Sequence, residues 1–97
     1  MPLKKGDRLF VRIDYRLEGS GFTEGDIQDH LAYVGNIAGE RYFAGGGFAN
    51  ADGGMALFQA ENMEEARKIA ENDPLMRRGL YRYEIYEWNL AVVSEDQ

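Results

Sequence analysis

Alternation of apolar and polar residues marks the first regular element of the chain. Every second residue from 9 to 17 is apolar or aromatic, which is typical of a strand with one buried face. The pattern predicts a strand whose helix-facing side carries Leu9, Val11, Ile13, Tyr15 and Leu17. The opposite, open side of the sheet would then carry Phe10, Arg12, Asp14 and Arg16.

The spacing changes to a helical period after residue 23. Thr23 is a suitable N-cap, and acidic residues follow it in the first turn, where the helix dipole favours negative charge. An apolar stripe then recurs at three- and four-residue intervals, which predicts a helix over 24–39. The stripe consists of Ile27, Leu31, Val34 and Ala38, with His30 beside it.

A second helical period begins at Asn62, where Glu65 three residues later resembles a capping box. Pro74 ends that helix, because proline cannot continue it. Strands are expected over 41–48 and 55–60, joined by a hairpin loop at 50–54, and a last strand over 80–93. Residues 75–78 can form one tight turn before Gly79.

These elements follow the order β-α-β-β-α-β, which predicts a ferredoxin-like α+β fold. The 97 residues make a single domain over 1–97, since two cores would each be under-sized. Helices on one side leave the other sheet face uncovered, and large aromatic side chains fall in the last strand. Because monomers rarely expose large apolar patches, we expect a homodimer.

Composition then removes several classes of function. The net charge of −6 makes nucleic acid an improbable partner, and the absence of cysteine excludes disulfides, thiolate metal sites and cysteine nucleophiles. A single histidine excludes multi-histidine metal sites, so no metal and no cofactor are expected. No apolar stretch is long enough for a signal peptide or a membrane span, which favours a cytoplasmic protein without membrane contact.

The lone histidine, His30, is the natural candidate for proton transfer. Its alternative is a core histidine satisfied by one hydrogen bond. Asp73 also falls on the inward side of its helix, where a carboxylate needs a partner, and an imidazole is one such partner. Asp73 precedes Pro74, so it is also a good cap for the following turn; the two roles are compatible because a carboxylate has two oxygens.

Three further features point to a binding site. The glycine run around Gly46 lacks the lysine of a phosphate loop, and its missing side chains instead allow a ligand or a helix to approach the sheet. Arg12 and Arg16 share one strand face and can bind an anion, or they can form a solvated or dimer-facing ladder with Asp14. Tyr15, on the expected helix-facing side, can line the pocket.

Several short motifs together resemble the YCII-related (YciI-like) family. They are His-Leu-Ala-Tyr at 30–33, Ala-Gly-Gly-Gly-Phe at 44–48, Glu-Glu-Ala at 64–66, Asp-Pro-Leu at 73–75, Gly-Leu at 79–80 and Trp88. The resemblance runs over nearly the whole chain, and Leu75 stands where the family usually has phenylalanine. It implies a dimeric α/β-barrel fold and an active site built on a His–Asp pair, here His30 and Asp73.

One branch of that family removes HCl from a chlorinated hydroxyhydroquinone, and the wider fold includes muconolactone isomerases. The resemblance therefore suggests a cofactor-independent lyase or isomerase of aromatic catabolism, acting on a small aromatic or quinone-like substrate. Asp73 would orient His30, which would take a proton, while Arg12 or Arg16 would hold a phenolate. The alternatives are a non-catalytic ligand-binding dimer, a purely structural dimer domain, and an oxidation without a cofactor, as in monooxygenases on related folds.

Overall fold

A computed structural model describes residues 3–19 and 21–94 of the chain. Its elements are β1 (Arg8–Arg16), α1 (Glu24–Glu40), β2 (Phe43–Gly47), β3 (Gly54–Phe58), α2 (Met63–Glu71), α3 (Pro74–Arg77) and β4 (Tyr81–Asn89). The tight turn expected at 75–78 is the short helix α3. The three later strands are shorter than predicted, because pairing ends before the apolar residues do, and the chain leaves β4 at Asn89.

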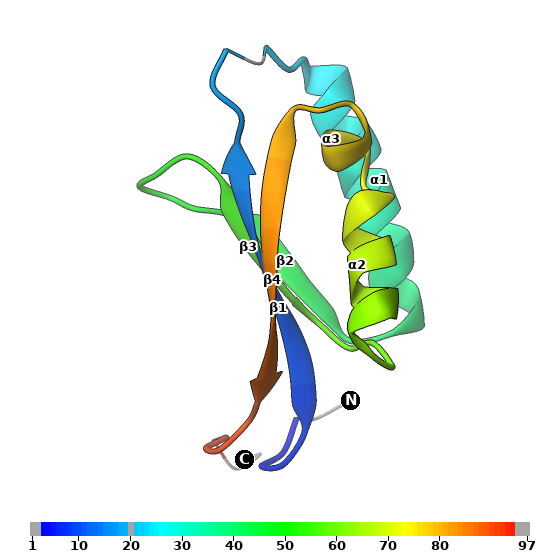
Figure 1. Cartoon of the computed structure of the whole chain (residues 1–97), viewed down its shortest axis with the longest axis vertical. Helices are drawn as coiled ribbons and strands as arrows, with labels where there is room; N and C mark the ends of the chain where they lie inside the picture. Colours follow the sequence, from blue (N-terminus) through cyan, green and yellow to red (C-terminus); the bar gives the residue numbers. More distant parts are fainter. Residues whose placement is uncertain (1–2, 20, 95–97) are drawn as a thin grey trace.

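The strands form one antiparallel sheet in the order β2-β3-β1-β4. Figure 1 shows α1, α2 and α3 on the same side of this sheet. This arrangement confirms the ferredoxin-like α+β fold. β1 lies between β3 and β4, so both of its edges are paired and its side chains occupy the middle of each sheet face.

Local signals start the helices where the sequence predicts. The hydroxyl of Thr23 accepts a hydrogen bond from the Asp26 N–H, and the Asp26 carboxylate accepts one from the Thr23 N–H, which completes a capping box. At α2 the side chain of Asn62 accepts from the Glu65 N–H. Each cap satisfies a helix N–H group that has no partner within the helix.

The two faces of β1 are the reverse of the sequence prediction. Phe10, Arg12 and Asp14 face the helices and are buried, whereas Tyr15 belongs to the opposite, open face. Alternation alone cannot decide which face is inside when both faces suit a buried environment. Here the polar pair is buried because its charges find partners within the fold, and the apolar face is left open.

The hydrophobic core lies between the sheet and α2. Its buried members are Phe10, Ala56, Phe58, Ala66 and Ile69. The Phe58 ring is 5.8 Å from that of Phe43 and 6.2 Å from that of Phe10, so it joins the side chains of three strands. Contacts of this kind hold β2, β3 and β1 together under the helices.

Helix α1 packs much less tightly than its predicted stripe implies. None of its residues is fully buried, and Leu31, expected to face the core, is 57% exposed. Ile37, rather than Ala38, packs against the core. The helix therefore stands away from the sheet along much of its length, and a pocket lies beneath it.

Replacement of Phe58 by alanine should lower the free energy of unfolding by about 3–5 kcal/mol, because it empties a fully buried volume between three strands. Urea denaturation followed by circular dichroism measures this loss. Val92→Ala, at an exposed position, is the control and should change the stability by less than about 0.5 kcal/mol. Equal effects of the two substitutions would contradict the position assigned to the core.

Candidate active site

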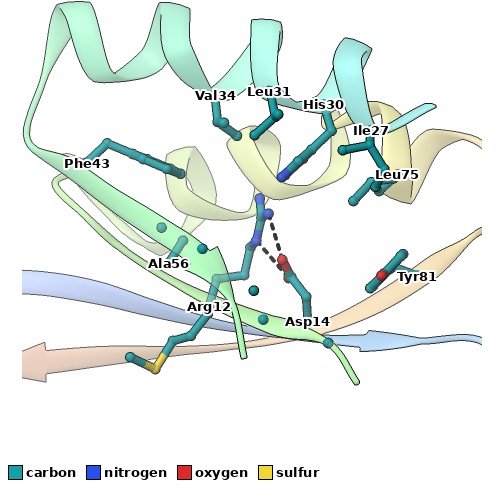
Figure 2. Close-up of a pocket in the computed structure, with 16 residues that line it drawn as sticks. Arg12, Asp14, Ile27, His30, Leu31, Val34, Phe43, Ala56, Leu75 and Tyr81 are labelled. Carbon is teal, nitrogen blue, oxygen red and sulfur yellow. Dashed lines mark hydrogen bonds and ion pairs between the residues drawn. The ribbon is translucent and has the colours of Figure 1, made fainter. Parts of the chain in front are cut away.

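A pocket of about 240 Å³ separates α1 from the sheet. Its roof is the apolar side of α1, and its floor is the glycine-rich part of β2 and β3, as Figure 2 shows. Polar groups gather at one place on its wall. The lining residues with the largest chemical consequence are Arg12, Asp14, His30, Gly45, Gly47, Gly54, Leu75 and Tyr81.

His30 of α1 and Asp73 meet across this pocket wall. The Nδ1 atom of His30 lies 2.9 Å from Oδ1 and 2.8 Å from Oδ2 of Asp73. Because the carboxylate only accepts, this geometry places a hydrogen on Nδ1 and leaves Nε2 as the ring nitrogen with a lone pair. The predicted contact between the two residues is present; the catalytic role of the pair remains a prediction.

Asp73 also caps α3, as the sequence suggests. Its Oδ1 accepts from the Leu75 N–H at 3.0 Å, and Pro74 takes the first helical position. The cap fixes the carboxylate at the point where α2 passes into α3, beneath α1. Asp73 therefore caps α3 at the bend between α2 and α3, and the same carboxylate contacts the imidazole of His30 on α1.

Arg12 joins this pair to the sheet. Its Nη2 donates to Oδ2 of Asp73 at 3.0 Å and to Oδ2 of Asp14 at 2.9 Å. Its Nε lies 2.8 Å from Oδ1 of Asp14 as an ion pair. Within the described residues Nη1 has no hydrogen-bond partner, although the side chain is only 1% exposed. A buried N–H group without a partner is costly, and Nη1 is therefore a donor that has capacity for one more acceptor.

The surroundings shift the pKa values of the Asp73 and Asp14 carboxyl groups in opposite directions. Burial alone would raise the pKa of Asp73, but the hydrogen bond from His30, the charge of Arg12 and the Leu75 N–H outweigh it and lower that pKa. Burial also raises the pKa of Asp14, and there the charge of Arg12 does not fully compensate. Asp73 is thus held as a carboxylate, while Asp14 is the carboxyl that binds a proton more readily.

The glycines on the floor serve different purposes. A Cβ at Gly54 would lie 2.5 Å from the carbonyl oxygen of Gly46, so glycine is required there by the sheet itself. A Cβ at Gly47 would meet only a backbone oxygen at 3.7 Å, and its absence therefore leaves room in the pocket. Gly46 lines the pocket through its backbone, while its neighbours Gly45 and Gly47 alternate with it and face the helices.

Two predicted binding residues lie elsewhere. Tyr15 is on the open face of the sheet, where its hydroxyl donates to Glu84 at 3.0 Å and the Arg82 guanidinium covers its ring at 4.1 Å. The prediction that it lines the pocket is wrong, because the faces of β1 are reversed. Arg16 ends β1 with its guanidinium 4.8 Å from the Phe22 ring and does not line the pocket formed by the described residues.

Asp14 is the site residue that the sequence reasoning did not select. The available signal was its spacing: two residues from Arg12 on one strand, so on the same face. The alternation in the sequence predicts that this pair lies on the open face, where a solvated pair of opposite charges is ordinary. On the buried face the same pair becomes a polar group inside the pocket.

Over 3–19 and 21–94, no cluster of three or more imidazole and carboxylate side chains has an arrangement that suits a metal ion. In the same part of the chain, no helix is long and apolar enough to cross a membrane.

Comparison with known families now identifies the chain. The model of the YCII-related domain matches residues 9–89. The chain belongs to the YCII-related family. It is 31% identical over 70 residues to the uncharacterized protein YjpA of Bacillus subtilis, a match that covers 71% of this chain and 82% of YjpA.

Solved structures of similar proteins support the fold. One is the 5-chloro-2-hydroxyhydroquinone dehydrochlorinase TftG of Burkholderia phenoliruptrix in complex with 2,5-dihydroxybenzoquinone, which is 24% identical with a TM-score of 0.67. That match covers 84% of this chain and 93% of TftG. A dimeric ferredoxin-like protein of unknown function from Thermobifida fusca is 12% identical with a TM-score of 0.51, over 92% of this chain and 97% of the other.

The buried ion pairs of Asp73 lead to a prediction about pH. Because its pKa is lowered by folding, Asp73 stabilises the fold above the ordinary value of 3.8, and this contribution is lost as the pH falls through the lower, folded-state pKa. Asp73→Asn should cost about 3–5 kcal/mol at pH 7, since it leaves Arg12 with one partner fewer in a buried site. Thermal unfolding between pH 7 and pH 3 measures both effects.

In that experiment the stability difference between the wild-type chain and Asp73→Asn should shrink toward pH 3. Asp52→Asn, at an exposed loop position, serves as the matched control and should unfold like the wild-type chain at each pH. A difference that stays constant with pH would show that Asp73 contributes by shape and not by charge.

Proposed function

We propose that the chain is a cofactor-independent enzyme that transfers protons on a small, oxygenated ring compound. The observation that carries this proposal is the contact of His30 Nδ1 with the fully buried carboxylate of Asp73 at the wall of a pocket. A pocket with few convergent polar groups and a carboxylate of shifted pKa is a good candidate for a catalytic site.

The dyad supplies a positioned base. Asp73 holds the hydrogen on Nδ1 and stabilises the imidazolium that forms when Nε2 accepts a proton from the substrate. The side chain of His30 is 19% exposed, so a ligand can reach it, whereas the side chain of its partner Asp73 is fully buried. Positioned acid–base catalysis of this kind contributes roughly 10²–10⁴-fold in rate.

Arg12 supplies the charge that a deprotonated substrate needs. Of the two predicted arginines it is the one at the pocket, and its Nη1 has no hydrogen-bond partner within the described residues. A phenolate oxygen that replaces this missing partner would satisfy a buried donor, so the interaction strengthens as the hydroxyl loses its proton. The backbone of Gly46 and its neighbours leaves space for a flat ring beside it.

The specific reaction that we propose is loss of HCl from a chlorinated hydroxyhydroquinone. Two hydroxyl protons leave, one proton is added to the ring carbon that carried chlorine, and chloride departs, which leaves a hydroxybenzoquinone. Oxidation of the two oxygen-bearing ring carbons balances reduction of the ring carbon that loses chlorine, so no external oxidant or reductant is needed. The similarity of fold to TftG and the family membership support this choice.

Chloride release from 5-chloro-2-hydroxyhydroquinone under anaerobic conditions tests the proposal. His30→Gln and Asp73→Asn should each lower kcat by about 10²-fold or more, because each removes the positioned base. Gln28→Ala, on the exposed side of α1, is the control and should keep the wild-type rate. Both site variants must first be shown to be folded.

Other outcomes separate the competing functions. Stoichiometric binding of the ring compound without turnover would favour a ligand-binding dimer. Consumption of oxygen would favour a monooxygenase-like reaction. Full turnover in both His30→Gln and Asp73→Asn would rule out the dyad.

We also propose that two copies of the chain pair through the open sheet face. β1 contributes Val11 and Ile13 to this face and β4 contributes Tyr86 and Trp88, and the charged residues Arg82 and Glu84 of β4 lie on the same face. Of the aromatic residues in β4, Tyr81 and Tyr83 point to the helix side, where the Tyr83 hydroxyl donates to Glu71 of α2. An apolar face of this kind on a small domain is typical of a subunit interface.

Tyr86→Lys should convert the dimer into a monomer, because it places a charge in the middle of an apolar interface. Size-exclusion chromatography with light scattering measures the mass of each form. Lys68→Glu, on the outer side of α2, is the control and should leave the mass unchanged. A wild-type chain that remains monomeric at high concentration would contradict this proposal.

A further inference from the structure

Asp14 lies in the middle of the pocket floor with one side uncovered. Its partner in the register of β3 is Gly54, so no side chain from that strand lies over its carboxyl group. Figure 2 shows the carboxyl rising from the sheet beside the Arg12 guanidinium, below His30. The residue lines the pocket and yet is only 7% exposed.

The local charges do not balance. One guanidinium, that of Arg12, contacts the carboxyl groups of both Asp14 and Asp73. Both carboxyl groups are buried, so the single positive charge of Arg12 is set against two carboxyl groups. An excess charge in a nearly dry site is costly, and an anionic ligand would add a second one.

We propose that Asp14 is a second proton-carrying residue of this pocket, which takes up a proton when an anionic ring ligand binds beside Arg12. The proposal deepens the proposed function, on which its catalytic consequence rests. It assigns the pocket a substrate class, an oxygen-bearing ring that binds as an anion, and gives the acid and base roles to two different residues.

The surroundings of the two carboxyl groups indicate which one takes the proton. Asp73 accepts from His30, Arg12 and the Leu75 N–H, and it has no exposed surface. The only side-chain partner of Asp14 within the described residues is Arg12. Protonation of Asp14 therefore breaks fewer interactions than protonation of Asp73.

The groups facing Asp14 from each neighbouring element agree with this choice. Arg12 lies on β1, His30 on α1 and Asp73 at the start of α3; β4 contributes Tyr81 and the cross-strand neighbour Tyr83, while the nearby parts of β2 and β3 are glycines. Burial and the negative charge of Asp73 raise the pKa of Asp14, whereas the charges of Arg12 and His30 lower it, and the pKa remains above its usual value. An anion next to Arg12 offsets the positive charge that stabilises the Asp14 carboxylate. The pKa of Asp14 is therefore raised further.

A protonated Asp14 completes the proposed chemistry. His30 Nε2 accepts the proton of a ring hydroxyl, the electron pair moves into the ring, and Asp14 gives its proton to a ring carbon. The result is the keto tautomer, with one O–H bond broken and one C–H bond formed. Where that carbon carries chlorine, loss of a second hydroxyl proton together with chloride completes the elimination of HCl.

Isothermal titration calorimetry with 2,5-dihydroxybenzoquinone as the probe tests the proposal at pH 7 in two buffers of different ionisation enthalpy. The wild-type chain should take up about one proton per ligand bound, as linkage requires when binding raises a carboxyl pKa through the working pH. His30→Gln should keep most of this uptake, and Asp14→Asn should lose most of it. Asp52→Asn, in the exposed loop before β3, is the matched control and should behave as the wild-type chain.

Two outcomes would overturn the proposal. One is uptake that survives in Asp14→Asn and disappears in His30→Gln, since His30 would then carry the proton. The other is failure of the wild-type chain to bind the probe. Binding with uptake on Asp14 but without chloride release from the chlorinated substrate would refute the proposed reaction and leave the role of Asp14 standing.

Thermal unfolding of Asp14→Asn tests whether the role of Asp14 is purely structural. If Asp14 serves only to hold Arg12, its loss should lower Tm by about 4 °C or more at pH 7. If it is a proton carrier kept at a cost to the fold, Asp14→Asn should lower Tm by less than Asp73→Asn does, because removal of the excess buried charge offsets the contact that Arg12 loses. A lowered Tm together with unchanged proton uptake would assign Asp14 to the structure alone.

Discussion

One guanidinium buried between two carboxyl groups organises this molecule. Arg12 lies on the central strand, and its contacts reach Asp14 on the same strand and Asp73 at the junction of α2 and α3. Through Asp73 the same chain of contacts reaches His30 on α1. A buried arginine is tolerated only when its charge is paired. The ion pairs of Arg12 therefore connect the helices to the sheet through the most polar part of the interior.

Much of the fold could be predicted from the sequence, because the signals that define it are local. Thr23 and Asn62 begin their helices, Pro74 follows a helix end, and the glycines near residue 53 mark the hairpin. The order of elements then limits the topology strongly. Where the strands stop is less well determined, because apolar residues such as Val92 continue beyond the last pair of β4.

The orientation of β1 could not be predicted from alternation. Both faces of β1 lie in surroundings that suit apolar side chains: one face lies under the helices, and the other is the open, apolar face. The sequence rule that polar residues face water assigned Arg12 and Asp14 to the wrong side. The ion pair between Arg12 and Asp73 joins residues 61 positions apart in the chain, and only the folded structure brings these two together.

His30 and Asp73 could be selected because each conflicts with its local surroundings. A histidine beside an apolar stripe and a carboxylate on an inward helix face both need a partner, and each is the type of partner the other needs. Asp14 gives no such signal in the sequence, since an Arg-x-Asp pair on a strand is ordinary on a solvated face. Its importance comes entirely from the side of the sheet on which it lies.

The orientation of β1 also places the pocket and the proposed subunit interface on opposite faces of one strand. On its inner face β1 carries the polar residues of the pocket, and on its outer face it carries Val11, Ile13 and Tyr15. Because successive side chains alternate between faces, a change of register by one residue would expose the site and bury the open face at once. The pairing of β1 with both β3 and β4 therefore protects the pocket and the proposed subunit interface by the same hydrogen bonds.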